Sequence, residues 1–205
     1  MLSSLFRQVL RPNHLHTYRL KSRRSSEIDF LRSLGTASDF RKLFATSTSI
    51  DLGSGPFPKN PFNADRVFGI DLCLADSVIN TDLLVDQIPI ENRSVHFVTA
   101  FNFIEHIPRC LIVNGQTCFP FIRIMNEVYR VLVPGGIFYS HTPAFPSLEA
   151  FTDPTHVNYI TESTFQDYFC GESPNSKMYG FDGGFDIVDQ VWHHDRLLTC
   201  LRKRA

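Results

Sequence analysis

The sequence lacks the features that mark several specialised protein classes. No run approaches the ~20 consecutive apolar residues that a membrane-spanning helix requires, so no integral membrane segment is predicted. It has no internal repeat, low-complexity tract or interdomain linker, and 205 residues suffice for one sizeable core but not for two comfortable domains. What is left is an ordinary globular protein, with 43% hydrophobic and 20% charged residues.

Cysteine is scarce. The five cysteines form no Cys-x-x-Cys pair and show no metal-ligand spacing. Their odd number and wide separation favour reduced thiols over a disulfide framework. The cysteines therefore indicate an intracellular protein, and the cytoplasm is the expected location.

Positive and negative charges nearly balance over the whole chain, but they are unevenly distributed. The formal net charge is −1, yet residues 1–26 hold six basic groups and no acid, which leaves 14 basic and 21 acidic groups in the remainder. An acidic body is a poor general binder of nucleic acid, because neutralising phosphates requires clustered lysine and arginine. We therefore divide the chain into a basic N-terminal extension, 1–26, and a single domain, 27–205, and expect no nucleic-acid partner.

The basic extension has three interpretations. The favoured one is an ordinary N-terminal segment that packs on the domain or stays partly disordered. Its arginine-rich, serine-containing and acid-free composition is also typical of a mitochondrial transit peptide, which would place the protein in mitochondria. The third interpretation is an amphipathic arm that touches a membrane surface or a partner, with Leu2, Leu5, Phe6 and Leu10 on one face.

Apolar periodicity predicts strands and helices that alternate along the domain. Patterns that resemble capping boxes begin at Ser26 and Thr36, and the second leads into Phe40, Leu43 and Phe44 at helical spacing. Strands are expected over 46–52, 66–71, 77–80, 95–101 and 136–142. Two further apolar runs, 185–192 and 197–201, follow near the C-terminus.

The clearest helix lies between the last two of those five strands. Its apolar stripe, at i, i+3, i+4, i+7 and i+11, consists of Phe121, Ile124, Met125, Val128 and Leu132. The run Pro134-Gly135-Gly136 is expected to end it. Together the elements predict an α/β fold with a Rossmann-like, mostly parallel sheet flanked by helices, and with an antiparallel C-terminal strand pair.

A glycine-rich turn follows the first predicted strand. Asp51-Leu52-Gly53-Ser54-Gly55 ends that strand, and Asp71 ends the second strand, 20 residues after Asp51. Ligands of open α/β sheets bind beyond the carboxyl ends of the strands, and glycine there lets the backbone approach a ligand. An acid at this distance suits the hydroxyls of a ribose. Paired glycines alone also fit an ordinary tight turn, but the combination predicts a nucleoside-type site.

The loop after this turn favours S-adenosylmethionine over a dinucleotide. A dinucleotide site uses G-x-G-x-x-G, with the pyrophosphate facing a helix N-terminus. Here Pro58 occupies the third glycine position, and about ten residues separate Gly55 from the second strand, which leaves little room for a crossover helix. Such a site is poorly built for a pyrophosphate but serves adenosine joined to a zwitterionic amino acid.

The glycine-rich turn is the first of several segments that occur in a characteristic order. They are 50–56 (IDLGSGP), 67–71 (VFGID), 82–83 (DL), 88–90 (IPI), 94–98 (SVHFV) with 102–106 (NFIEH), and 127–136 (EVYRVLVPGG). Each piece alone is weak. The ordered set, which spans about 48–142, resembles class I S-adenosylmethionine-dependent methyltransferases, within the methyltransferase-type-11-like group.

This resemblance implies a cofactor site for S-adenosylmethionine, built from the ends of the first two strands. Asp51, Gly53 and Gly55 would hold the methionine part of the cofactor. Asp71 would accept hydrogen bonds from the ribose hydroxyls, and Leu72 next to it is included in the site.

By the same resemblance, the site continues after the third and fourth strands. Asp82 would bond the adenine amino group, with Leu83 beside it, and Asn102 would lie by the methionine and the transferred methyl group. The sequence departs from the family pattern at Phe57, which replaces the third glycine of the first motif, and in the short first crossover.

Candidates for substrate chemistry follow the fourth and fifth strands. Methyl transfer requires the enzyme to position the acceptor and to remove its proton, and histidine titrates near neutral pH. His156 and Asp153 would orient or deprotonate the acceptor, with His106 as a further base and His141 as a weaker one. Structural alternatives remain: Asp153 and Thr155 fit a turn that ties its own backbone, and His106 fits a helix cap.

The loop 144–157, which carries two of these candidates, should fold across the carboxyl edge of the sheet. Phe145 and Phe151 in it would enclose an acceptor. His193 and His194 are expected at a strand edge or turn, away from the chemistry.

Further absences narrow the substrate. No Asn-Pro-Pro-Tyr-like run follows the fourth strand and no Pro-Cys pair occurs, which favours a small-molecule acceptor with oxygen as the methylated atom. Asp153 and His156 on one loop are too few ligands for a metal, so no metal site is predicted. The alternatives are a nucleotide-dependent oxidoreductase or epimerase, disfavoured by Pro58 and by the lack of a Tyr-x-x-x-Lys pair, and a methyltransferase-like protein that binds the cofactor or a partner without catalysis.

Overall fold

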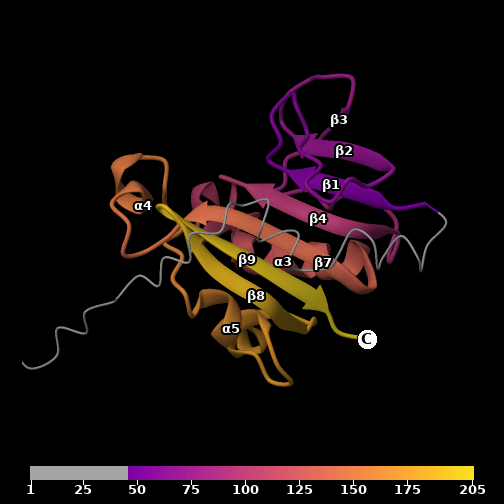
Figure 1. Cartoon of the computed structure of the whole chain (residues 1–205). Helices are drawn as coiled ribbons and strands as arrows, with labels where there is room; N and C mark the ends of the chain where they lie inside the picture. The colour runs from indigo at the N-terminus through magenta and orange to yellow at the C-terminus, as the bar shows by residue number, and fades with distance from the viewer. Residues whose placement is uncertain (1–45) are drawn as a thin grey trace, which may run out of the picture.

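The computed structural model describes residues 46–205, which form a seven-stranded sheet with helices and loops around it (Figure 1). In spatial order the strands are β3 (Val78–Asn80), β2 (Arg66–Asp71), β1 (Thr48–Leu52), β4 (Val95–Phe101), β7 (Leu132–Pro143), β9 (Arg196–Lys203) and β8 (Phe185–His193). The strands from β3 to β7 pair in parallel, and β9 is antiparallel to both of its neighbours. The mostly parallel sheet and the antiparallel C-terminal pair predicted from the sequence are therefore confirmed.

The remaining elements are short apart from one helix. They are the α-helices α3 (Pro120–Val131), α4 (Glu149–Thr152) and α5 (Thr164–Phe169), the 3₁₀ helices η1 (Ile104–His106) and η2 (Asn175–Tyr179), and the hairpin strands β5 (Leu111–Val113) and β6 (Gln116–Cys118). Within the described range no helix is long and apolar enough to cross a membrane. The basic extension and the two expected capping boxes, with the helical pattern through Phe44, lie outside the described residues.

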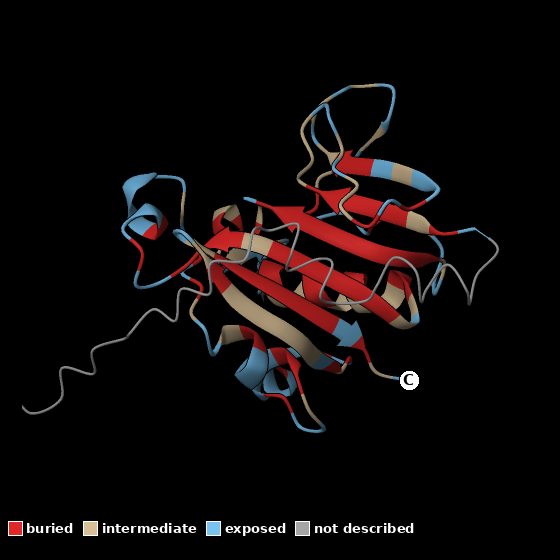
Figure 2. Ribbon diagram, viewed as in Figure 1, coloured by how far each residue is buried: buried red, intermediate tan, exposed pale blue. Residues whose placement is uncertain are grey.

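The core forms where α3 packs against the middle of the sheet. Its apolar stripe, including Ile124, Met125 and Val128, is buried in one cluster with Ile50 and Val98 of neighbouring strands. All seven residues of β4 are buried (Figure 2), as expected of a central parallel strand with both faces covered. Each large apolar side chain buried in this way contributes about 1.5–3 kcal/mol, so the centre of the sheet is a rigid platform for the loops at its edge.

Two boundaries differ from the sequence prediction around the Pro134-Gly135-Gly136 run. The helix ends at Val131, and β7 begins at once with Leu132, so the expectation that these glycines separate helix and strand was wrong. The reason is that Leu132 is already extended and pairs with Val95, while the register shifts before Ile137 pairs with Phe97. Gly135, with φ +78°, accommodates this irregularity inside the strand.

The hairpin of β5 and β6 was missed, although its turn has a strong local signal. Asn114 and Gly115 have φ angles of +50° and +77° and connect Val113 to Gln116, which pair with each other. A two-residue Asn-Gly turn is typical of type I′ hairpins. The flanking strands have only three residues each, with little alternation of polar and apolar side chains. The Asn-Gly turn was therefore the only local pattern from which this hairpin could have been predicted.

The first crossover has no helix, as the sequence predicted. Residues 53–65 run as a loop between β1 and β2. The loop is closed by Asn60, whose side chain donates to Ala64 O at 2.9 Å and accepts from Ala64 N at 2.8 Å. Backbone polar groups that a helix would pair internally are thus partly satisfied by a side chain, and the loop keeps a defined path.

Candidate active site

The carboxyl ends of β1, β2 and β4 meet at one edge of the sheet. Leu52, the last residue of β1, pairs with Ile70 of β2 and with Ala100 of β4. The glycine-rich turn, Asp71 and Asn102 therefore leave the sheet side by side. This is the edge at which open α/β sheets bind their ligands.

Asp51 supports the loop that follows the glycine-rich turn. The side chain is 1% exposed. Its carboxylate accepts a hydrogen bond from the Thr99 hydroxyl at 2.6 Å and from the Lys59 backbone N–H at 2.8 Å. Burial raises the pKa of Asp51, and these hydrogen bonds oppose that rise. Both carboxylate oxygens are thus engaged with β4 and with the proline-rich loop.

The two glycines of the turn are required for different reasons. Gly53 and Gly55 have φ angles of +63° and +58°, which L side chains rarely adopt. A Cβ at Gly53 would also overlap the ring of Phe103 and lie 2.9 Å from the Cβ of that residue. A Cβ at Gly55 would meet nothing within 4 Å. Both glycines were expected to make room for a ligand; in the structure a protein neighbour, Phe103, is the immediate constraint on Gly53.

Asp71 faces the same turn but keeps hydrogen-bonding capacity. Its Oδ2 accepts from Gly55 N at 2.9 Å and its Oδ1 accepts from Cys73 N at 3.0 Å. The side chain is only partly buried, and each carboxylate oxygen has a second lone pair. A pair of hydroxyls such as those of a ribose could therefore be accepted without breaking either bond.

The other predicted cofactor residues differ in exposure. Leu72 is 67% exposed, whereas Leu83 is 5% exposed and belongs to the core. Asp82 is partly buried, and its Oδ1 accepts from Leu84 N at 2.9 Å. The open space beside Gly55 and the remaining lone pairs of Asp71 and Asp82 fit a nucleoside, whereas Leu83, buried in the core, has little surface to offer one.

Asn102 adopts a conformation that few residue types tolerate. Its φ is +48°, in the left-handed region where asparagine is enriched. Its backbone N–H donates to His141 O at 2.9 Å, which fixes this turn to the end of β7. The side chain is exposed and lines a cavity.

This cavity has a volume of about 670 Å³ and lies where the loops after β4 and β7 meet. It is lined by Asn102, Glu105, His106, Glu149, Thr152, Asp153, Pro154, His156 and Arg196. Figure 1 shows α4, part of this lining, at the edge toward which the arrows of β4 and β7 point. The backbone N–H groups of Val157 and Asn158 both donate to Glu105 O at 2.9 Å, which fastens the two loops together. All three predicted catalytic residues, His156, Asp153 and His106, are brought to this one cavity.

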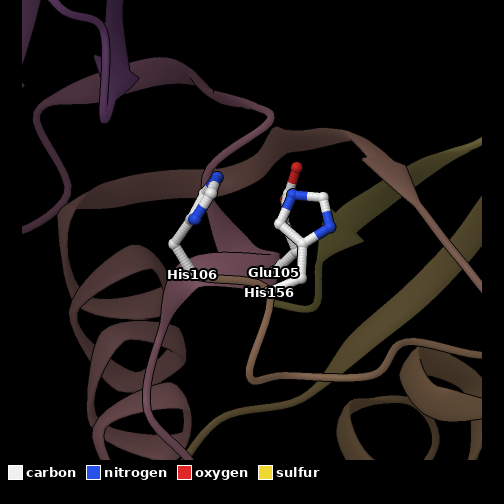
Figure 3. A group of neighbouring side chains, drawn as sticks. All are labelled: Glu105, His106 and His156. Atoms are coloured by element: carbon white, nitrogen blue, oxygen red, sulfur yellow. The ribbon is translucent and has the colours of Figure 1, made fainter. Parts of the chain in front are cut away.

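The two histidines are neighbours in the wall of the cavity, His106 from η1 and His156 from the loop after β7 (Figure 3). The ring centroids of His106 and His156 are 4.8 Å apart and the rings are inclined by 71°. His156 Nδ1 lies 3.0 Å from Glu149 O, and His106 Nδ1 lies 2.9 Å from Thr155 Oγ1. The second nitrogen of each ring is therefore the one available for chemistry.

Asp153 forms the turn that the sequence allowed as its structural alternative. Its Oδ1 accepts from the Thr155 N–H at 2.8 Å and from the Thr155 hydroxyl at 2.7 Å. Those hydrogen bonds lower the pKa of Asp153 against a smaller effect of burial, which holds the carboxyl ionised. Its Oδ2 lies 3.8 Å from His156 Nε2, so the same residue both shapes the turn and faces the histidine.

Sequence reasoning gave Glu105 no role of its own beyond its neighbour His106. The side chain is 1% exposed and accepts from the Thr142 hydroxyl at 2.7 Å. Burial raises the pKa of Glu105, and the Thr142 hydrogen bond opposes the rise. In the sequence, an acid next to a histidine looks like an ordinary exposed polar residue. Glu105 differs from such a residue only in being buried, and a three-residue 3₁₀ helix is too short for a local pattern to predict which of its residues are buried.

The predicted aromatic enclosure does not form part of this cavity. Phe145 and Phe151 contact each other edge to face, with centroids 6.4 Å apart, and both remain over 40% exposed. Arg196, from β9, lines the cavity instead and pairs with Glu149. Neither charged residue was predicted: Arg196 comes from a distant strand, and Glu149, although it lies in the predicted loop 144–157, has no local pattern that pairs it with Arg196.

Comparison with known proteins supports the fold. No protein-family model and no curated protein matches the sequence. Among solved structures, a SAM-dependent methyltransferase from Aquifex aeolicus matches with a TM-score of 0.50 and 10% identity, over 88% of this chain and 100% of that one. The YcgJ protein from Bacillus subtilis matches with a TM-score of 0.52 and 13% identity, over 85% and 99%.

A third solved structure with this fold carries a different name. The [4+2]-cyclase SpnF matches with a TM-score of 0.52 and 14% identity, over 89% of this chain and 84% of that one. At such identities the similarity establishes the fold. The chain thus has the Rossmann-like fold of class I S-adenosylmethionine-dependent methyltransferases, as the ordered sequence motifs implied.

Proposed function

We propose that the protein is an S-adenosylmethionine-dependent methyltransferase that acts on a small molecule, with an oxygen as the acceptor atom. One observation carries the proposal: Phe103 packs on Gly53 of the glycine-rich turn, while Asn102 next to it lines the cavity that holds His106 and His156. A nucleoside on the turn and an acceptor in the cavity would therefore be neighbours.

In this proposal the cofactor residues act as the resemblance implies. Asp71 accepts hydrogen bonds from the ribose hydroxyls through its remaining lone pairs, and Asp82 accepts one from the adenine amino group. Gly55 leaves room for the methionine part. Asp51 departs from its expected role, because it is buried and both carboxylate oxygens accept from Thr99 and Lys59, so it would support the loop rather than contact the methionine. When bound, S-adenosylmethionine supplies an activated methyl group for in-line transfer.

The cavity would hold the acceptor. Its volume of about 670 Å³ is in the range of small-molecule sites, about 300–1,000 Å³. His156 Nε2 is placed to take the acceptor's proton, and Asp153, 3.8 Å away, would stabilise the charged imidazole. Asn102 and His106 would orient the acceptor, since positioning supplies most of the catalysis of such a displacement.

Ligand binding tests the proposal most directly, because a fold alone does not define an activity. Calorimetry on the full chain with S-adenosylmethionine, S-adenosylhomocysteine and NAD in parallel should show binding of the first two and none of the third. Binding of NAD alone would replace the proposal with an oxidoreductase or epimerase. Binding of none would leave a partner-binding protein. Release of S-adenosylhomocysteine in the presence of small hydroxyl compounds then tests the transfer itself.

A further inference from the structure

Three side chains with metal-ligating atoms converge at the wall of the cavity. One potential ligand atom from each of Glu105, His106 and His156 lies within 4.8 Å of the others (Figure 3). The group joins η1, after β4, to the loop after β7, so it exists only in the folded chain. Two imidazoles and a carboxylate are a donor set that several divalent cations use.

Both histidines have Nδ1 occupied and so present Nε2. Glu149 O can only accept, so His156 Nδ1 carries the proton of that 3.0 Å hydrogen bond. The Thr155 hydroxyl donates its single proton to Asp153 at 2.7 Å, so it must accept from His106 Nδ1. Metal-binding histidines are held in this way, with the second ring nitrogen donating to a carbonyl or to a group backed by a carboxylate.

Glu105 provides an independent sign of a ligand. Its Oε2 accepts from Thr142, but its Oε1 is buried and has no hydrogen-bond partner among the described residues. A buried carboxylate oxygen without a partner is costly, because it has lost its hydration and gained no hydrogen bond in exchange. A cation between Glu105 and the two Nε2 atoms would satisfy it.

We propose that Glu105, His106 and His156 bind a divalent transition-metal cation such as Zn²⁺, Fe²⁺ or Mn²⁺. Magnesium and calcium prefer sites made wholly of oxygen, which this one is not. Ligands on one ion at about 2.0–2.2 Å lie at most about twice that distance apart, so the present group needs only small side-chain rotations. Asp153 Oδ2, 3.8 Å from His156 Nε2, is within reach as a further ligand or as the acceptor for a coordinated water.

The role of the cation rests on the proposed methyltransferase function. Acceptors that fit are small molecules with a hydroxyl that can coordinate it beside Asn102. With Nε2 of His156 bound to the cation, that nitrogen no longer takes the acceptor's proton. The cation instead lowers the pKa of the coordinated hydroxyl, and the proton passes to solvent. The oxygen forms a bond to the sulfonium methyl carbon while the carbon–sulfur bond breaks and its electron pair stays on sulfur. The products are the methylated acceptor, neutral S-adenosylhomocysteine and one proton.

Cation binding can be measured without cofactor or acceptor. The full chain, stripped with a chelator, is titrated with Zn²⁺ and with Mn²⁺ by calorimetry and with Co²⁺ by visible absorption. We expect one ion per chain, and at least tenfold weaker binding in each of the His106→Gln and His156→Gln variants. The double variant His193→Gln/His194→Gln is the control, because those rings are also adjacent, with centroids 4.6 Å apart, and should bind as the wild type does.

The outcomes separate the proposals. Wild-type cation affinity in both single variants, or loss of cation binding only in the control, would indicate adventitious binding and overturn the metal site. Absence of cation binding by the wild type would also overturn it. A Glu105→Gln variant would test the third ligand. If it fails to fold, the two histidine variants still decide whether the metal site exists. A chain that binds the cation but not S-adenosylmethionine keeps the metal site and loses the methyltransferase; the reverse result does the opposite.

Discussion

The Thr142 hydroxyl donates a 2.7 Å hydrogen bond to Glu105 Oε2, and both side chains are almost fully buried. This bond ties β7 to η1 behind the cavity. The carbonyl of Glu105 also accepts from the backbone of Val157 and Asn158. One residue therefore joins the loops after β4 and β7, and the relative placement of His106 and His156 depends on it.

Replacing Asp71 by Ala should weaken S-adenosylmethionine binding by about 1.5–3 kcal/mol, the usual range for hydrogen bonds to a charged group. The fold should persist, since Asp71 ends its strand and is only partly buried. Calorimetry measures the affinity, and thermal unfolding verifies the fold. Asp76→Ala, an exposed acid in the same loop, should bind normally. Unchanged affinity in a folded Asp71→Ala variant removes this residue from the site.

Gly53→Ala and Gly55→Ala should differ in severity although both glycines have positive φ. At Gly55 only the backbone cost applies, about 1–2 kcal/mol of stability, because a Cβ there meets nothing. At Gly53 the Cβ also collides with Phe103, so that variant should be less stable and lose cofactor binding.

Urea unfolding measures both glycine variants. Adding Phe103→Ala to Gly53→Ala should recover part of the lost stability, because it removes the overlap with the Phe103 ring but leaves the 2.9 Å contact with the Cβ of residue 103 and the backbone strain. Equal stability of the two single variants, or no recovery in the double variant, contradicts the steric explanation.

His156→Ala should reduce turnover by 10²–10⁴-fold, the effect typical of losing a general base. The dissociation constant of S-adenosylmethionine should hardly change, because no cofactor contact is assigned to His156. Steady-state kinetics with the acceptor and calorimetry with the cofactor give the two quantities. His194→Ala serves as the control. If the affinity for S-adenosylmethionine falls as much as turnover does, His156 belongs to the cofactor site and not to the acceptor site.

Glu127→Gln should destabilise the protein by about 1.5–3 kcal/mol at pH 7. Glu127 accepts from Arg130 and from Ile88 N. Burial alone would raise its pKa, but these hydrogen bonds and the charge of Arg130 outweigh burial and lower it below 4.5. The contribution of ionised Glu127 to the free energy of unfolding is therefore complete above pH 4.5, and it disappears as the pH falls through the pKa of Glu127 in the folded state.

Urea unfolding at a series of pH values tests this dependence. The difference in the free energy of unfolding between the wild type and Glu127→Gln should become smaller as the pH is lowered. Glu91→Gln, at an exposed position, should show no gap at any pH. A difference in the free energy of unfolding that stays constant from neutral to acid pH would mean that folding does not lower the pKa of Glu127.

Much of the fold was readable from local patterns. Strands 66–71 and 95–101 were predicted with their observed bounds, and the stripe through Ile124 and Val128 located α3. These elements depend on side-chain periodicity within a few residues, which sequence displays directly. The start of β7 at Leu132 was missed because a strand that continues straight from a helix has no local boundary signal.

For the site, the sequence by itself determined which residue types stand at the strand ends. These are glycines that tolerate positive φ at 53 and 55, Asp71 as the last residue of β2, and Asn102 directly after β4. Only the tertiary structure decided that Glu105 is buried with one oxygen unpartnered, and that one ligand atom each of Glu105, His106 and His156 lies within 4.8 Å of the others. The two histidines are 50 residues apart, and they meet because β4 and β7 are parallel neighbours whose carboxyl ends lie at one edge. That pairing is a property of the whole sheet, so no local stretch of sequence encodes it.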